Sequence, residues 1–222
     1  MHETALPLTR VHVDPAPQPR ERGETDWREC LPTLTGRLVT LRELSPADAP
    51  VLLPLIAAPE VSRFLSPPPR SVERFTGFIE STLRERRAGR YTGFAIVPHG
   101  SSTPVGLVQL RQLEPAFRTA EWGIALGAAW WGRGLFQDVA QLVLEFAFDR
   151  LGTDRLEARV AAQNARGNRA VEKLGAVAEG LLRSSLQVAD GTRHDQVLWA
   201  WLTEDWQRAR QQAVQEATPW VH

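Results

Sequence analysis

Residues 119 to 161 constrain the fold more than any other part of the chain. The segment TAEWGIAL (residues 119 to 126) is short and apolar, as strands are, whereas LFQDVAQLVLEFAFDRLG (residues 135 to 152) is apolar over most of a helical circumference. A second strand-like segment, RLEARVA, follows at residues 155 to 161. Two strands joined through a helix form a parallel pair with a crossover connection. The sequence therefore predicts one parallel pair beside a helix that is buried on more than one side.

The segments around this crossover predict a mostly antiparallel sheet. RLVTLREL (residues 37 to 44) alternates with the period of two of a strand, and Ser45, Pro46 and Asp48 mark a helix start directly after it. The other expected elements are a helix at residues 71 to 88, strands at 93 to 97 and 104 to 113, a helix at 164 to 175 and a hairpin formed by 176 to 188 and 193 to 202. We expect an α+β (mixed α/β) fold in which a twisted sheet of about seven strands is flanked by helices.

Composition indicates one domain. The chain has 222 residues, 43% of them apolar, and we assign the domain to residues 34 to 205. Residues 1 to 33 are rich in proline and lack periodicity, so we expect a flexible extension there, and we expect residues 206 to 222 to form a helical tail.

The balance of charges and the single cysteine indicate which partners and which cellular location to expect. Lys and Arg number 26, as do Asp and Glu, so we expect no nucleic-acid or membrane partner. No apolar run approaches the roughly 18 residues of a membrane span. Cys30 is the one cysteine and cannot form an internal disulfide, which favours a cytoplasmic location.

The loop GAAWWGRG (residues 127 to 134) has the features of an anion site. It leads directly into the crossover helix, whose first amides and positive dipole end would meet an anion at the end of the strand. Gly132 and Gly134 allow the backbone to approach closely, and Arg133 between them adds a positive charge. Two glycines that only turn the chain are the alternative, and the spacing fits neither a P-loop nor the dinucleotide fingerprint.

Two motifs in this order resemble the GNAT acyltransferase superfamily, and within it the branch of RimJ- and RimL-type ribosomal-protein N-terminal acetyltransferases. One is EWGIALG followed by WWGRG and its helix, and the other is NARGNRAVEKLGA, from residue 164 to residue 176. The likeness covers about residues 34 to 202. The resemblance implies a GNAT fold with a splayed parallel pair, acetyl-CoA or another acyl-CoA as cosubstrate, no metal, and acyl transfer to a primary amine such as a protein N-terminal α-amine.

The same resemblance implies that the cosubstrate lies between the splayed strands. The cofactor contacts that it implies are the backbone of Ile124, Ala125 and Leu126, the loop and first helical turn at Trp131, Gly132, Arg133, Gly134, Leu135 and Phe136, and the second motif's Asn164, Asn168 and Lys173. An ordinary helix N-cap is compatible with the role of Asn164, and a solvated helix face is the alternative for Lys173.

Acyl transfer to an amine needs a base and a donor for the developing oxyanion. Glu121, on the central strand, is the candidate base, acting through water, and the Leu126 backbone amide is the candidate oxyanion donor. The alternative for Glu121 is a partly buried acid paired with Arg111 or Arg159.

The sequence departs from the family at the proton donor for the leaving thiolate. Val171 stands where the family often has a tyrosine, and Gly167 replaces the serine of the N-x-x-S pattern. Tyr91 is the only tyrosine and belongs to an early strand, so either water protonates the thiolate or the enzyme is slow. Ala129 also replaces a polar residue that often opens the pyrophosphate loop.

The acceptor site is expected between the helices after the first strand and the last hairpin. Its expected lining comprises Phe64, Leu65, the proline run at residues 67 to 69 and Phe75 as walls, and Arg183, His194 and Asp195 as polar groups. A surface residue of the hairpin is the alternative for His194. Arginines there favour an acidic or carboxylated partner, including a longer acyl group. The alternatives to a protein N-terminus are a polyamine, amino acid or antibiotic acceptor, or an acyl-CoA-binding module without turnover. Exposed Trp199 or Trp201 would suit a homodimer edge.

Overall fold

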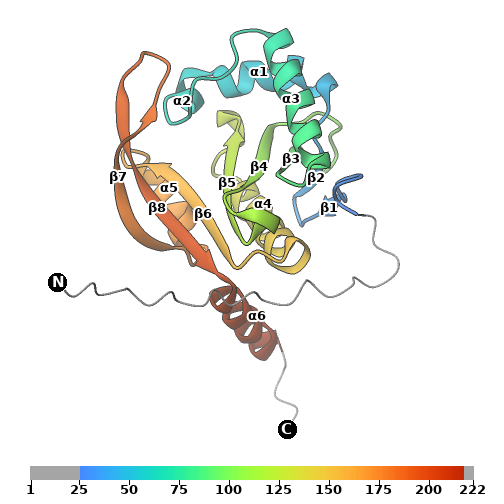
Figure 1. Ribbon diagram of the computed structural model, residues 1–222, viewed down its shortest axis with the longest axis vertical. Coiled ribbons are helices and arrows are strands. Elements are labelled where there is room, and N and C mark those ends of the chain that lie inside the picture. The colour runs from blue at the N-terminus through green and yellow to red at the C-terminus, as the bar shows by residue number, and fades with distance from the viewer. Residues whose placement is uncertain (1–25, 218–222) are drawn as a thin grey trace, which may run out of the picture.

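A computed structural model of the protein describes residues 26 to 217 (Figure 1). Its strands are β1 (Leu34–Thr35), β2 (Val39–Glu43), β3 (Tyr91–Pro98), β4 (Gly106–Gln112), β5 (Thr119–Leu126), β6 (Arg155–Ala161), β7 (Val177–Gln187) and β8 (Arg193–Leu202). Its α-helices are α1 (Ala49–Ala57), α2 (Pro59–Ser62), α3 (Val72–Arg87), α4 (Leu135–Glu145), α5 (Ala165–Glu172) and α6 (Thr203–Ala217). Short helical turns are η1 (Pro46–Asp48), η2 (Pro115–Phe117), η3 (Ala128–Trp130) and the π-helical η4 (Phe146–Leu151).

The strands form one sheet in the order β1-β2-β3-β4-β5-β6-β8-β7. All neighbouring pairs are antiparallel except β5 and β6, which are parallel and pair only between residues 119 to 121 and 155 to 157. Beyond that point the two strands diverge. The expected mixed fold with a splayed parallel pair is confirmed, and the structure adds the two-residue strand β1, which is too short for a sequence pattern to show.

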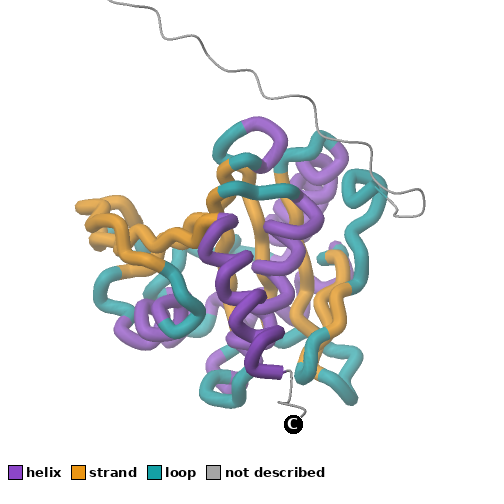
Figure 2. Tube along the Cα trace, turned by 90° about the horizontal axis from the view of Figure 1, so that it is seen from below, coloured by secondary structure: helices purple, strands orange, loops and turns teal. Residues whose placement is uncertain are grey.

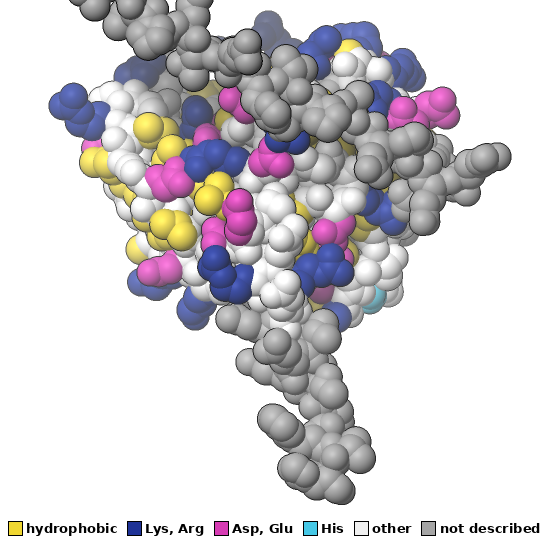
Figure 3. Space-filling model, turned by 60° about the horizontal axis from the view of Figure 1, so that its bottom comes forward, with side chains coloured by type: hydrophobic (Ala, Val, Ile, Leu, Met, Phe, Trp, Pro, Cys, Tyr) yellow, Lys and Arg dark blue, Asp and Glu magenta, His cyan; other side chains and the backbone are white. Residues whose placement is uncertain are grey.

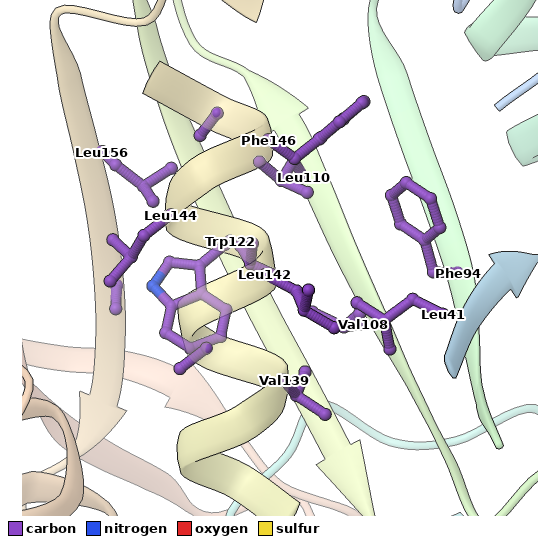
Figure 4. Packing of buried hydrophobic residues seen from close by; sticks show 14 of the residues in the cluster. Leu41, Phe94, Val108, Leu110, Trp122, Val139, Leu142, Leu144, Phe146 and Leu156 are labelled. Atoms are coloured by element: carbon purple, nitrogen blue, oxygen red, sulfur yellow. The ribbon is translucent and has the colours of Figure 1, made fainter. Parts of the chain in front are cut away.

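Helices cover both faces of the half-sheet formed by β2 to β5. On one face, α1 and α3 pack Leu52 and Ile79 against the sheet. On the other face, α4 lies across the strands, and its Val139 belongs to the largest apolar cluster (Figure 4). Phe94 of β3 meets Phe146 of η4 edge to face, with 5.3 Å between ring centroids. Because α4 is enclosed in this way, its first turn is held firmly at the end of β5.

Two carboxylates near helix starts fix loops around this core. Asp48 closes a capping box with Ser45, as the helix-start pattern predicts, and also binds the Arg42 guanidinium. Asp138, in the first turn of α4, accepts backbone hydrogen bonds from the β1–β2 turn, from Leu38 at 2.8 Å and from Val39 at 3.0 Å. The start of α4 is thereby tied to β2.

Two side chains just before the predicted domain boundary at residue 34 pack against the domain. Trp27 and Leu31 are buried in the main cluster, and the Trp27 ring packs edge to face on Phe117. The buried Arg86 donates to the Trp27 carbonyl, which anchors the segment to α3. Trp27 and Leu31 are therefore part of the core, and the predicted extension falls within the described residues only at positions 26 to 33.

The β7–β8 hairpin stands out from one side of the body, at the left of Figures 1 and 2. Trp199 and Trp201 are nevertheless buried, at 8% and 3% exposure, because they point toward the core and α5 rather than outward. The expectation that they form an exposed dimer edge is therefore wrong.

Helix α6 follows β8 and packs on η4, where Trp206 stacks on Phe148. The surface seen in Figure 3 mixes acidic and basic side chains without a continuous field of one sign. Within the described residues, no helix is long and apolar enough to cross a membrane.

Candidate active site

The divergence of β5 and β6 leaves part of β5 without a neighbouring strand. At the end of β5 the Gly127 amide donates to the Val105 carbonyl at 2.9 Å, and the direction of backbone groups alternates along an antiparallel strand. Ala125 therefore directs its amide and carbonyl toward β4, whereas Ile124 and Leu126 direct theirs into the gap. Of the three residues predicted to bind the cosubstrate through their backbone, only Ile124 and Leu126 have the required orientation.

The loop after β5 brings free amides to the mouth of this gap. Gly132 and Gly134 have positive φ angles of 73° and 81°, the left-handed conformation that glycine adopts without strain. The amides of residues 132 to 136 have no hydrogen-bond partner among the described residues, and no side chain caps α4. The Trp131 amide, in contrast, donates to Ala128 within the loop. Five of the six predicted loop positions thus present free amides in the manner of an anion site.

The tryptophans and arginines of the loop hold it in shape. The Trp131 indole nitrogen donates to the Leu126 carbonyl at 2.9 Å, which fixes the loop to the end of β5. The Arg166 guanidinium, from α5, lies 4.3 Å from the centre of the Trp131 ring. Arg133 lies over Trp130 in the same way, at 5.2 Å. These cation–π contacts place two positive charges beside the free amides, and Arg166 also joins the two sides of the splay.

Helix α5 begins at Asn164 on the β6 side of the gap. The Asn164 side chain accepts from the Gly167 amide at 2.9 Å, so it is the N-cap. A Cβ on Gly167 would lie 2.6 Å from the side-chain nitrogen (Nδ2) of Asn164. The glycine that replaces the family serine therefore leaves room for this cap. The Asn168 side chain is engaged by the Ala161 carbonyl and the Trp199 indole, and Lys173 is exposed at the end of α5. Asn168 therefore has a structural role in joining α5, β6 and β8.

Glu121 lies where β5 and β6 separate, and it pairs with both arginines that the sequence offers. Its carboxylate oxygen is 2.8 Å from Arg111 of β4 and 3.6 Å from Arg159 of β6, and its side chain is 23% exposed. Arg159 also approaches Glu157, at 3.8 Å. The two ion pairs hold the carboxylate of this candidate base at the last paired position before the gap.

The side chains that replace the usual proton donors do not supply a proton. Val171 is buried, and Gly167 has no side chain. The Tyr91 hydroxyl donates to Gln109 at 2.6 Å, and burial raises the pKa of Tyr91 to about 12. Tyr91 is therefore a strongly held neutral phenol on β3.

This geometry has close counterparts among known proteins. The sequence profile described as "Acetyltransferase (GNAT) domain" matches residues 38 to 177, more than half of the chain. The chain belongs to the GNAT N-acetyltransferase family. A solved acetyltransferase-class structure from T. thermophilus is 30% identical, with a TM-score of 0.69, over 84% of this chain and 97% of that one.

Other relatives agree with the RimJ/RimL-type branch. The Bacillus subtilis (strain 168) protein YdaF, provisionally named a ribosomal N-acetyltransferase, is 26% identical over 76% of this chain and 93% of its own length. Mycobacterium smegmatis RimJ, solved in complex with CoA-disulfide, has the same fold, with a TM-score of 0.70 and 24% identity over 78% of this chain and 88% of that one.

In this GNAT protein the predicted acceptor walls are only partly brought together. Phe75 is buried in the cluster between α3 and the sheet, so it does not line a site. Phe64, after α2, packs against the small cluster of Ala161, Leu186 and Val188 at the hairpin. Leu65 is half-buried, and its amide donates to Ser62 within the turn that ends α2.

The predicted polar acceptor residues lie at two cavities of the hairpin. One, of about 860 Å³, is lined by Arg159, Leu181, Leu182, Arg183, Ser184, Ser185 and Asp195. The other, of about 420 Å³, includes His194, whose ring lies 2.6 Å from the Gln163 amide. In the part of the chain that the structure describes, no cluster of three or more His, Cys, Asp or Glu residues could hold a metal ion.

Proposed function

We propose that this GNAT protein transfers an acetyl group from acetyl-CoA to a primary amine, with a protein N-terminal α-amine as the acceptor. The observation that carries this proposal is the junction of two sets of free backbone groups. The edge of β5 that faces the gap, with the backbone groups of Ile124 and the amide of Leu126, leads directly to the free amides of residues 132 to 136. An extended chain that ends in phosphates is complementary to that sequence of donors and acceptors.

Acetyl-CoA supplies the activated acyl group, and the residues of the gap fit its parts. The amides of residues 132 to 136, with the Arg133 side chain, would hold the pyrophosphate. Ile124 and Leu126 would hold the amide-bearing pantetheine arm as a neighbouring strand would, and Asn164 would contact it from the β6 side. Asn168 and Lys173 stay as weaker candidates near the nucleotide end.

The chain's own groups suit direct transfer. The acceptor nitrogen forms a bond to the acyl carbon as the C–S bond breaks, and Glu121 takes the amine proton through a water molecule. The Leu126 amide, which faces the gap, stabilises the developing oxyanion. Water protonates the departing thiolate, because Val171 and Gly167 offer no acidic group.

A protein N-terminus is favoured over a polyamine by the charge of the cavity next to Glu121. That cavity is lined by two arginines and one aspartate, so its side chains carry a net positive charge that disfavours a polycation. The provisional name of YdaF, a ribosomal N-acetyltransferase, supports the same choice.

Release of CoA thiol from acetyl-CoA tests the proposal. The acceptors are peptides with a free N-terminus, the same peptides with a blocked N-terminus, and spermidine, and the constant signal of the exposed Cys30 is subtracted. We expect release only with free α-amines, and acetylation at that nitrogen by mass spectrometry. Turnover with spermidine alone would instead establish a small-molecule enzyme. Binding of CoA without thiol release for any acceptor would show a module without turnover.

A further inference from the structure

The wall of the larger hairpin cavity is a built feature of β7. The β7–β8 register shifts between Leu182 and Leu186, and within the shift Ser184 has a positive φ of 51°. The Ser184 amide donates to Asp195 at 2.8 Å, and its carbonyl accepts from the Arg193 guanidinium at 2.6 Å. A bulge that is bonded from both sides holds the adjacent side chains in fixed directions.

The bulge displays Arg183, whose guanidinium has no hydrogen-bond or ion-pair partner within the described part of the chain. Arg183 is exposed and lines the cavity. The Asp195 carboxylate, which lines the same cavity, is already bound to the Ser184 amide.

A second guanidinium connects this cavity to the splay. Arg159 lines the cavity and reaches Glu121, but only at 3.6 Å, and it reaches Glu157 at 3.8 Å. Both acids have closer partners, since Glu121 lies 2.8 Å from Arg111 and Glu157 lies 2.9 Å from Arg155. Arg159 is therefore only weakly paired, and its guanidinium can also bind an anionic group of a ligand.

We infer that this cavity binds a carboxylate carried by the acceptor, through Arg183 with help from Arg159, and so selects amines with an acidic group near the reacting nitrogen. The inference rests on the proposed acetyl transfer and specifies its acceptor. The two sources of that chemistry are a peptide with an acidic residue next to its N-terminus and a free amino acid. Charge-assisted bonds to a guanidinium are the strong class of hydrogen bond.

Acceptor pairs that differ in one charge test the inference. The peptide pair has glutamate or glutamine at the second position, and the amino-acid pair is glycine and glycinamide. For wild type we expect kcat/KM to be roughly tenfold higher for the charged member of at least one pair, and which pair responds identifies the source. The ratio should fall as NaCl is added, because the cavity is open to solvent.

Two variants with the same change of charge separate a local effect from a general one. Arg183→Glu should bring the kcat/KM ratio to one or below, with unchanged affinity for CoA. Arg208→Glu is the control, because Arg208 is an exposed residue of α6 that pairs only with Asp205 in the described part. A ratio of one in wild type, or equal ratios in both variants, with acetyl transfer intact, would overturn the inference and leave the proposed function. No transfer to any of the acceptors would overturn both.

Discussion

Glu121 is both a partner in structural ion pairs and the candidate catalytic base. Its ion pairs with Arg111 and Arg159 tie three strands together at the point where the sheet opens. The same position makes it the carboxylate nearest to the gap on β5. Glu121 therefore has either a structural role or a catalytic role. Substitution of Glu121 and, separately, of its partner Arg111 distinguishes the two.

Glu121→Gln should lower kcat by about 100-fold, because general bases contribute roughly 10² to 10⁴ to the rate. The KM for acetyl-CoA should change little, since the proposed contacts to the cosubstrate are made by backbone groups. Steady-state kinetics with a peptide acceptor measures both constants.

Arg111→Gln is the matched control for this prediction. It removes the 2.8 Å ion pair but keeps the carboxylate of Glu121, so most of kcat should survive. Equal losses in the two variants would show that the ion pair matters and the base does not.

At the scale of elements, the left-handed backbone conformation of Gly132 helps to set the direction of the free amides in the β5–α4 loop. At Gly132 a Cβ would meet no atom within 4 Å, so the positive φ alone restricts substitution there. Gly132→Val should therefore force a different loop conformation and redirect the free amides. We expect the affinity for CoA to fall at least tenfold by calorimetry, since the left-handed conformation costs a non-glycine residue about 1 to 2 kcal/mol.

Gly100, in the β3–β4 turn, offers a control with the same local properties. It has a φ of 79° and open space around its Cβ position, yet it lies outside the gap. Gly100→Val should destabilise the fold to a similar extent and leave CoA affinity unchanged. If Gly132→Val also left affinity unchanged, the phosphate assignment would be refuted.

The junction of α4 with β2 predicts a pH dependence of stability. Burial acts to raise the pKa of Asp138, but the backbone amides of Leu38, Arg37 and Val39 outweigh it and leave the pKa below its usual value. The stabilisation is therefore complete above the unfolded-state pKa of about 3.9 and is lost as the pH falls through the lower folded-state pKa.

Asp138→Asn should lower the free energy of unfolding by about 1 to 2 kcal/mol at pH 7. The difference from wild type should shrink as the pH falls below about 4, because the wild-type carboxylate becomes protonated. Urea denaturation at a series of pH values measures it. A difference that stays constant down to about pH 2, well below the usual pKa of an aspartate, would exclude a role for the charge.

The sequence predicted the helices and strands well, because their hydrophobic periodicity is local. It did not predict features that depend on contacts between residues far apart in the chain. The helix start at Ser45 and the crossover through α4 follow from patterns within a few residues, and the structure confirms both. Trp27 lies in a stretch without periodicity, and its burial depends on Phe117 and Arg86, far along the chain.

The site shows the same division. The positive φ angles of the loop glycines agree with their spacing before a helix. The orientation of Ala125 depends on the register with β4, and the bulge at Ser184 depends on Asp195, so neither is visible in the sequence pattern.

At the scale of the whole molecule, two half-sheets are joined by three residue pairs between β5 and β6. Amide hydrogen exchange should reveal this arrangement. In the free protein, the amides of Ile124 and Leu126 should exchange faster than that of Ala125, which is bonded to β4. CoA should protect the first two selectively. Equal protection of all three in the free protein would contradict the orientation derived from the register.

Most sheet proteins carry their unpaired strand edges at the rim, where another chain can add to them. This molecule also has a pair of edges at its centre, facing each other across the splay and too far apart to bond. A ligand seated there completes the sheet as a missing strand would, so its binding energy adds directly to the energy that holds the halves together. The free energy of unfolding should then rise with the logarithm of the ligand concentration, and Tm should rise with it. The concentration of cosubstrate in the cell would thus affect the stability of the protein.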